Sequence, residues 1–585
     1  MNKLKDKSQS FMMNVVIILF AQIMVKLLGM VYRIVITNID GFGDVGNGFY
    51  NAGFQVYTVL LALSSVGIPN AIAKMVSERA ALEDYKGAHN IFKSAFLLFT
   101  VIGLVCSAFL FFGADFVAVH ILHMDGAQYV MRALAPSIFF VCISSVIRGY
   151  FQGLNNMHAS SRSQMFEQVF KCTFTIVLVL LAVDNMPAIM EFVSRIAFLC
   201  RGDMYTGNPP KTSPEILAAW ANAASSLATL FSFLYLAAFY LKRKSGIMEK
   251  VRITAVESLH ESTGKIMKSV LMLSIPISLA SIITAVNRVV DLATITRNIE
   301  IAFSACIPAH GNTAAIFNPT AKQLNSEALR LSGMLSKSDT LINMPLALNI
   351  AFATVLVPSI ASALALGDRK EASEKIIYSF LISILLIMPC CIGFIALARP
   401  IYMVIYPKAV EGYDLLAIMS VSLIFSALSQ TMSGALQGIG KVFVPAISIL
   451  AGCVVKVILN IILIRQPSIN IYGAAISSIA CQATAFLISF IVLSKYVSLK
   501  MSISKYVIKP LIAGGIMGIT AWAAYKLFMA VIGSNIVSTL LAIAFAATVY
   551  LILVLALKIL SENEIKMLPG GNAIYRLLER VKIYS

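Results

Sequence analysis

One short pattern occurs twice in this chain, once in each half. The first copy is GYFQG at residues 149–153, followed by Lys171, and the second is GALQG at residues 434–438, followed by Lys456. The spacing from the first glycine to the lysine is the same in both copies. Two similar halves within a strongly apolar chain are typical of membrane transporters, whose substrate path lies between the halves. The repeat therefore predicts a carrier built from two related lobes.

The composition indicates a polytopic membrane protein. Apolar residues make up 59% of the chain and charged residues only 13%, against about 25% charged residues in a soluble domain. About fourteen apolar segments approach the roughly 20 residues that span a bilayer as a helix. None alternates with a period of two, which excludes a membrane barrel. The segments are approximately 11–36, 50–73, 91–113, 130–153, 164–183, 216–240, 269–294, 339–365, 376–397, 412–437, 443–464, 471–493, 509–531 and 535–558.

These segments predict an all-α fold of about fourteen transmembrane helices. Helices 1–6 and 7–12 are predicted to form two parallel six-helix repeats, and two extra C-terminal helices follow them. The predicted divisions are 1–240 for the N-lobe, 241–268 for a basic linker, 269–495 for the C-lobe, and 496–585 for the last two helices and a tail. The C-lobe includes a long outer loop at residues 295–338, and residues 184–215 form another outer loop.

The basic residues set the predicted orientation. The net charge is +18, and Lys and Arg gather in alternate loops, as the positive-inside rule requires. Both termini and the linker are therefore predicted inside the cell, and the two long loops outside. No basic domain with interleaved aromatic residues is present, so we expect no nucleic-acid partner. The densest basic cluster, which also attracts anionic lipids, comprises Lys242, Arg243, Lys244, Lys250, Arg252, Lys265 and Lys268.

The chain shows no catalytic constellation. It has no nucleophile motif, no paired catalytic carboxylates, no phosphate-cradling glycine loop before a helix, and no Cys/His spacing that indicates a metal site. We therefore expect no enzymatic activity, no metal and no cofactor. The coupling ion or membrane potential that would drive a carrier is left open.

Several ionisable residues lie within the predicted spans, where each costs about 2.5–3.5 kcal/mol on insertion scales. Glu167 and Lys171 are four residues apart and can neutralise each other on one helix face. Arg288 and Asp291, three apart, can do the same. The sequence leaves open, for both pairs, whether the cation serves the fold or a ligand.

Three further cations, Lys26, Arg33 and Lys456, have no acidic residue within one helical turn. Gly452 stands where the second repeat would need an equivalent of Glu167. A partner on another helix or a water-filled, anion-attracting cavity would each explain them. A cationic cavity suits a phosphate, a pyrophosphate or a uronate, and arginine offers bidentate geometry. The predicted substrate-binding residues are Arg33, Arg288, Lys26, Lys456 and Lys171.

The repeated Gly-x-x-Gln-Gly pattern ends the fourth and tenth predicted helices. Glycine permits close helix packing or a bend, and glutamine can supply a hydrogen bond. A packing role and a functional role are both compatible with the pattern. The residues of this helix-end motif are Gly149, Gln152, Gly153, Gly434, Gln437 and Gly438.

Four runs carry a resemblance to a known family: KLLGMVYR at 26–33, GNGFY at 46–50, SVGIPNAIAK at 65–74 and RGYFQGLNNM at 148–157. The chain resembles the polysaccharide-exporter branch of the MOP flippase superfamily. The last run, with the nearby Glu167, is especially similar to the stage V sporulation protein B (SpoVB) and YtgP group. That group includes the MurJ-type lipid II flippases of Gram-positive bacteria.

The resemblance implies a fourteen-helix fold of two six-helix lobes around a central cavity, with a final helix pair that offers a groove for a lipid tail. It also implies that Arg33 and Arg288 act in the central cavity, because they occupy the positions of the family's cavity arginines. The expected partners are membrane lipids and an anionic lipid-linked glycan. The expected setting is the plasma membrane of a bacterium, where one copy of the chain would act alone.

The function expected from these features is flipping of an undecaprenyl-pyrophosphate-linked cell-wall precursor, lipid II or a relative, by alternating access. One alternative is a cation-coupled exporter of small molecules, although helix 1 lacks the acidic residue that such exporters use. The other is a non-transporting membrane scaffold for envelope or spore assembly. Neither the glycan nor a role in sporulation follows from the sequence.

Overall fold

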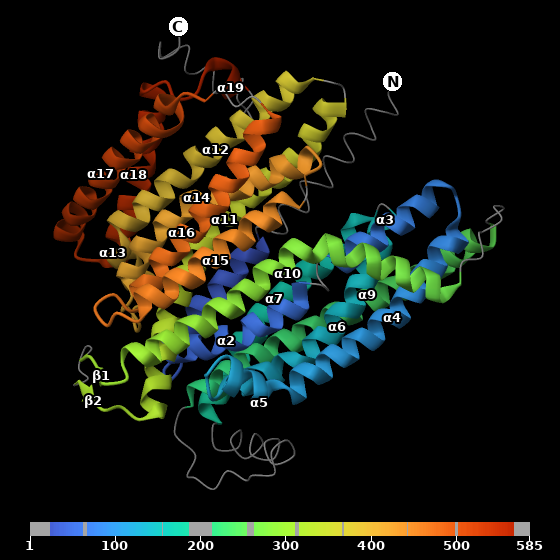
Figure 1. The fold of residues 1–585 in the computed structure, drawn as a ribbon, viewed down its shortest axis with the longest axis horizontal. Helices are drawn as coiled ribbons and strands as arrows, with labels where there is room; N and C mark the ends of the chain where they lie inside the picture. The colour runs from blue at the N-terminus through green and yellow to red at the C-terminus, as the bar shows by residue number, and fades with distance from the viewer. Residues whose placement is uncertain are drawn as a thin grey trace. The chain divides into compact units, whose positions relative to one another are not determined.

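The computed structural model describes residues 24–62, 67–154, 156–185, 213–253, 262–309, 315–365, 368–441, 443–497 and 501–566. Almost all of these residues are helical (Figure 1), which confirms the predicted all-α class. The chain separates into two compact units. The first comprises residues 1–336 and 460–471, and the second comprises residues 337–459 and 472–585.

The first unit begins with a helix whose described part is residues 24–37. Its other helices are α2 (Gly43–Ala62), α3 (Ile68–Ala81), α4 (Tyr85–Phe112), α5 (Ala114–Phe116), η2 (Val117–Ile121), α6 (Ala127–Gly153), α7 (Met157–Asp184), α9 (Pro214–Ile253), α10 (Thr263–Ala302) and the start of α11 (Ala321–Ala365). The strands β1 (Cys306–Ile307) and β2 (Ile316–Phe317) form a small antiparallel pair.

Helix α6 is the central helix of the first unit. In its most apolar stretch 78% of the residues are buried, whereas α4 and α7 reach only 22% and 17%. One end of α6 packs in a core around Tyr50, Met131 and Leu134, and the other in a core around Ile72 and Phe92. Outer helices keep exposed apolar residues, as expected for surfaces that face lipid.

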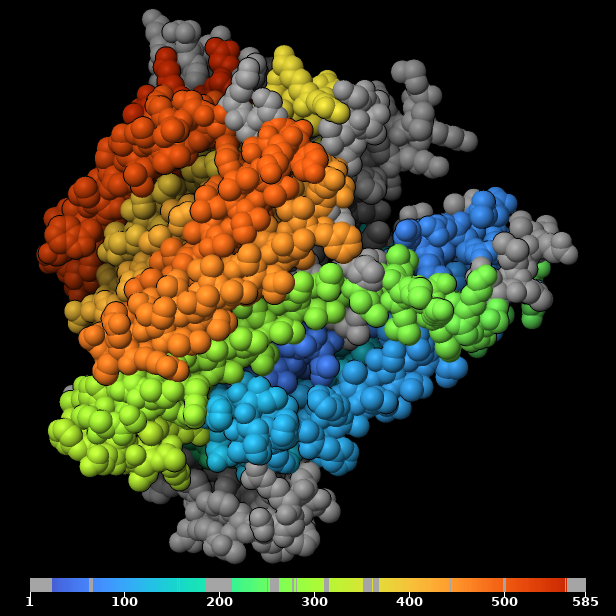
Figure 2. Space-filling model, viewed as in Figure 1, coloured from blue at the N-terminus to red at the C-terminus, as the bar shows by residue number. Residues whose placement is uncertain are grey.

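The second unit contains the rest of α11, and its last described helix is the short α19. Its other helices are α12 (Arg369–Ala396), α13 (Ala398–Ile405), α14 (Tyr413–Gly438), α15 (Val444–Ile464, of which the last five residues belong to the first unit), α16 (Ile471–Tyr496), η3 (Ser504–Ile508), α17 (Lys509–Ile532), α18 (Asn535–Ala556) and α19 (Glu562–Lys566). Helix α14 is the most buried of its candidate spans, at 61%. Helices α17 and α18 pack on each other and, through α17, on α12. They carry many exposed apolar residues and lie along the edge of this unit (Figures 1 and 2).

Local features repeat between the two halves as well. Asp84 caps α4 by accepting a hydrogen bond from the backbone N–H of Gly87 at 2.7 Å, and Asp368 caps α12 in the same way with Glu371 at 2.8 Å. The buried central helices α6 and α14 each follow a glycine with positive φ, Gly126 and Gly412. These pairs have nearly the same separation in sequence as the two Gly-x-x-Gln-Gly motifs. The repeat therefore extends to caps and helix starts.

Ten described helices are long and apolar enough to cross a membrane, so the chain is a multi-span membrane protein; the total of fourteen stays a prediction. Most predicted segments coincide with helices, but residues 50–73 are shared between α2 and α3. Pro69 lies in the first turn of α3, where its missing N–H costs no intrahelical hydrogen bond.

The predicted outer loop at 295–338 is wrong in extent. Helix α10 continues to Ala302 and α11 begins at Ala321, so most of the segment is helical. Hydropathy marks where a helix leaves the apolar layer and not where it ends. Glu327 and Arg330, which pair at 2.9 Å along α11, support a helix that continues beyond that layer. Most of the other predicted loop, residues 186–212, lies outside the described residues.

Candidate functional site: a cation and tyrosine cluster in the first unit

Arg33 lies against the aromatic face of α2. Its guanidinium carbon is 4.3 Å from the centre of the Tyr50 ring. One terminal nitrogen donates a hydrogen bond to the hydroxyl of Ser336 at 2.7 Å. The Nε atom is buried and has no hydrogen-bond partner among the described residues. The ring and the hydroxyl orient the guanidinium without neutralising it, so its charge stays available to a ligand.

Lys171 of α7 reaches the same aromatic group. Its ammonium lies 4.9 Å from the ring centre of Phe54 and 5.6 Å from that of Tyr32. The hydroxyls of Tyr32 and Tyr50 are hydrogen-bonded to each other at 2.9 Å. Adjacent rings therefore hold Arg33 and Lys171, and the helix at 24–37, α2 and α7 meet at this point.

Lys26 and Arg288 complete the cluster. Both side chains are exposed, and Arg288 and Lys171 are close enough to act electrostatically on the charge of Lys26. Within the described part of the chain, none of Lys26, Arg33, Lys171 and Arg288 forms an ion pair with a carboxylate. Four of the five predicted substrate-binding residues thus belong to one unit and carry net positive charge.

The predicted pairing of Glu167 with Lys171 is wrong. Glu167 accepts a hydrogen bond from Arg148 of α6 at 2.7 Å. Arg148 also donates to the hydroxyls of Ser163 and Ser232, each at 2.9 Å. Arginine can serve three acceptors at once through its forked donors. The acid at 167 therefore belongs to a structural network, and Lys171 is left to the aromatic group.

The possible pairing of Arg288 with Asp291 does not form. Asp291 accepts a hydrogen bond from the side-chain amide of Asn460 at 2.8 Å, whereas Arg288 is exposed. A spacing of three residues permits contact but does not select it over a partner from another helix. A nearby contact of the same kind joins Arg465 to Asn298 at 2.8 Å.

Lys456, the fifth predicted residue, lies on α15 in the second unit. It is half-buried and has interactions of its own. Gly452, one turn earlier, approaches the backbone of Cys481 so closely that a Cβ atom would lie 2.5 Å from its carbonyl oxygen. The glycine at this position therefore allows α15 to pack against α16. A substrate role for Lys456 stays a prediction.

The first helix-end motif makes the close contact between α6 and α3. A Cβ atom on Gly149 would lie 2.7 Å from the carbonyl oxygen of Pro69, and one on Gly153 would lie 2.7 Å from the Cβ of Val76. Gln152 donates a hydrogen bond to Ser160 at 2.7 Å. This copy packs two helices and fixes the turn into α7. In the second copy, Gly434 and Gly438 are buried on α14 while Gln437 is exposed.

Sequence reasoning missed the aromatic half of the cluster. Tyr50, Phe54 and Tyr57 lie along one face of α2, and successive ring centres are 6.0 and 5.7 Å apart. Their spacing of four and then three residues is a helical stripe that the sequence displays. Such a stripe is ordinarily core packing, and nothing local indicates that cations from other helices cover it. Among the described residues no group of His, Cys, Asp and Glu is arranged to hold a metal ion.

Comparison with known proteins gives two family-model matches and several full-length relatives. Residues 11–199 match the family model described as polysaccharide biosynthesis protein, and residues 327–560 match that of the lipid II flippase MurJ. The uncharacterized membrane protein YabM of Bacillus subtilis (strain 168) is 25% identical over 576 residues, covering 96% of each chain. Stage V sporulation protein B of the same organism is 23% identical over 561 residues, covering 96% of this chain and 98% of its own.

Two solved structures share the fold. An inward-facing MATE family multidrug resistance transporter of the MOP superfamily matches with a TM-score of 0.62 at 13% identity, covering 83% of this chain and 98% of its own. The lipid II flippase MurJ in an inward closed conformation matches with a TM-score of 0.57 at 14% identity, covering 93% and 98%. The resemblance that the sequence motifs predict is thereby confirmed: the chain is a multi-span membrane protein that shares the fold of these transporters and resembles SpoVB and MurJ.

Proposed function

We propose that this protein is a flippase that carries an undecaprenyl-pyrophosphate-linked cell-wall precursor, lipid II or a related lipid-linked oligosaccharide, across the plasma membrane by alternating access. The observation that carries the proposal is the cluster of Lys26, Arg33, Lys171 and Arg288, which has no carboxylate partner among the described residues. Matches to family models of polysaccharide biosynthesis proteins and of MurJ support it.

The energetics favour an anionic ligand at this cluster. Each cation in a membrane helix costs about 2.5–3.5 kcal/mol, and a cation–π contact returns only about 0.5–2 kcal/mol. Aromatic contacts therefore stabilise the cluster without offsetting its full cost. Water and a polyanionic head group supply the remaining stabilisation. A pyrophosphate offers more charge and more acceptors than a single carboxylate, so it can engage several of these cations together.

In this mechanism Arg33, oriented by Tyr50 and Ser336, binds the pyrophosphate through its guanidinium. Lys171 and the more exposed Lys26 and Arg288 add positive charge around the same site. The glycan occupies the aqueous cavity while the lipid tail stays in the bilayer. The apolar surface of α17 and α18 is the proposed place for that tail, because these two helices lie outside the repeats.

A proteoliposome assay tests the function directly. Purified protein should translocate a lipid-linked pyrophosphate glycan, and Arg33→Ala and Arg288→Ala should reduce translocation to background at normal expression. Lys171→Ala should also lose transport yet remain folded, because Glu167 keeps its partner Arg148. Full activity of Arg33→Ala at normal abundance would contradict the cationic site. If the protein transports a different lipid-linked oligosaccharide but not lipid II, the flippase function is supported and lipid II is rejected as its substrate.

The exporter alternative rests on the fold shared with a MATE transporter. A shared fold does not determine which substrate is carried. The choice between an anionic and a cationic substrate therefore rests on the charges of the site. The described part of the first helix, residues 24–37, holds Lys26 and Arg33 and no acid, which favours an anion over a cation. Sodium- or proton-driven export of small cations in the same liposomes would reverse this choice. A scaffold that transports nothing would leave all these assays at background.

The proposed orientation places residues 241–268 in the cytoplasm and the start of α11 outside, following the Lys and Arg distribution. Ser326 and Ser245 are exposed and suit cysteine labelling in a background without the native cysteines. Ser326→Cys should react with an impermeant thiol reagent in intact cells, and Ser245→Cys should react only after permeabilisation. The reverse result would invert the topology.

A further inference from the structure

A second cavity lies apart from the cation and tyrosine cluster, at the end of the first unit predicted to face the cytoplasm. Its volume is about 660 Å³, within the range of about 300–1,000 Å³ typical of ligand sites. It is lined by α3, α4, the end of α6 and the last turns of α9. None of Arg33, Lys171 and Arg288 lines it.

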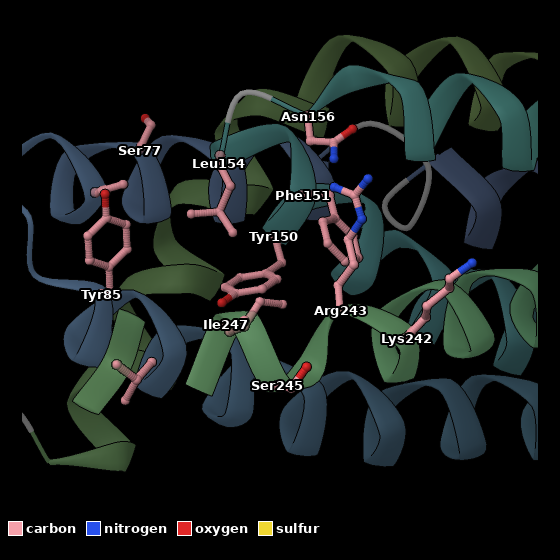
Figure 3. A pocket seen from close by; sticks show the side chains of 14 residues that line it. Ser77, Tyr85, Tyr150, Phe151, Leu154, Asn156, Lys242, Arg243, Ser245 and Ile247 are labelled. Carbon is pink, nitrogen blue, oxygen red and sulfur yellow. The ribbon is translucent and has the colours of Figure 1, made fainter. Parts of the chain in front are cut away.

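The lining combines two cations, Lys242 and Arg243, with polar groups and apolar side chains. Arg243 extends toward Asn156, and the Tyr150 ring lies between Tyr85 and Arg243 in this view (Figure 3). Lys242 points away from the other labelled side chains. Among the described residues no carboxylate lines the cavity, so an anion would meet no repulsion from these side chains.

Arg243 is oriented but not neutralised. Its guanidinium carbon lies 4.6 Å from the ring centre of Phe239, one turn earlier on α9. Within the described residues it forms no ion pair. An arginine held by an aromatic ring keeps its forked donors for an external acceptor, and a phosphate matches that fork.

The surroundings favour a lipid over a soluble phosphate compound. Phe151, Leu154 and Ile247 give the cavity apolar walls. Next to it in sequence, Leu82 and Leu241 are 67% and 64% exposed, as expected for side chains that contact the acyl region of a bilayer. Basic side chains at this level attract anionic head groups. We propose that this cavity binds the phosphate of an anionic membrane lipid, with Arg243 as its phosphate-binding residue.

Native mass spectrometry of the purified full-length protein, titrated with phosphatidylglycerol, tests the site. The unaltered protein should hold one lipid tightly, and Arg243→Gln should weaken that binding about tenfold, because a charge-assisted hydrogen-bonded contact is lost. Lys244→Gln is the matched control: it removes the same charge from the next exposed residue, which does not line the cavity. It should change the affinity less than twofold.

Three further arms separate the alternatives. Ser77→Trp keeps every charge but fills the cavity from α3, and should weaken binding as Arg243→Gln does. Phosphatidylcholine should not bind tightly, and a tenfold excess of inorganic phosphate or glycerol phosphate should not displace phosphatidylglycerol. Equal losses in Arg243→Gln and Lys244→Gln, or displacement by the soluble phosphates, would overturn the proposal. Arg33→Ala should leave this binding intact, so the result does not depend on the transport function.

Discussion

Arg148 and Arg33 show two ways in which membrane helices accommodate an arginine. Arg148 is buried, pairs with Glu167 and donates to two serine hydroxyls. Arg33 lies on a tyrosine ring, donates to one serine, and keeps a buried Nε without a partner among the described residues. The first arrangement satisfies the charge within the protein. The second leaves it for a ligand, so only Arg33 is expected in the transport site.

Removal of Arg148 should therefore damage the fold rather than the substrate site. Arg148→Ala leaves the partly buried Glu167 carboxylate without its cation, and should destabilise the protein by about 2–4 kcal/mol. Arg148→Met combined with Glu167→Gln should recover most of that loss, because no charge is left unpaired. Thermal unfolding of the detergent-purified protein measures both. A single variant as stable as the unaltered protein would show that the network is dispensable.

At the scale of elements, α6 and α14 are the most buried candidate spans of their units, and each ends in the repeated motif. In α6 the two glycines allow the backbone of α3 to approach. Glycine costs about 0.5–1 kcal/mol relative to alanine in a helix, and the close packing compensates for this. A helix contact of this kind uses van der Waals packing in place of the hydrophobic effect, which is weak between helices in lipid.

The α3–α6 contact makes a direct prediction. Gly153→Leu should lower the stability by about 1–3 kcal/mol, because the new side chain overlaps Val76. Gly515→Ala on α17 is the control, since nothing lies within 4 Å of a Cβ atom there, and it should be neutral or slightly stabilising. The comparison uses thermal unfolding in one detergent. Equal effects of the two substitutions would mean that glycine matters only through helix propensity.

At the scale of the molecule, alternating access requires contacts that form in one state and separate in another. In the first unit α2 and the start of α11 cross at two glycines. A Cβ atom on Gly48 would overlap the backbone of Leu329, and one on Gly333 would overlap the carbonyl of Asp44. These helices come from different predicted repeats, so their crossing is a suitable seal for one side of the proposed substrate path.

We therefore expect Gly48→Ala to open this crossing. Ser332, beside Gly333, is only 2% exposed, so Ser332→Cys should react slowly with a thiol reagent in a background without the native cysteines. Adding Gly48→Ala should increase the rate of that reaction several-fold, because the state in which the two helices are in contact becomes less stable. The protein should stay folded, and its transport should be reduced. An unchanged labelling rate would show that the crossing does not depend on Gly48.

The sequence by itself determined the class of the protein and the position of most helices. Long apolar runs without a period of two must become membrane helices, because lipid leaves no other way to satisfy the backbone. The repeated motif and its lysine marked equivalent positions in the two halves. The sequence also showed which cations need an explanation, because a charged side chain within a membrane span has a free-energy cost at any position.

Only the tertiary structure decided which groups those cations meet. Glu167 is four residues from Lys171, yet it pairs with Arg148, and Asp291 takes Asn460 in place of Arg288. Sequence spacing shows which partners a side chain can reach along its own helix. Which partner it actually contacts depends on whether a neighbouring helix places a better donor beside it. Hydropathy did not predict that residues 295–302 and 321–338 are helical, for a related reason. A helix can continue beyond the apolar layer of the bilayer where ion pairs between its own side chains stabilise it.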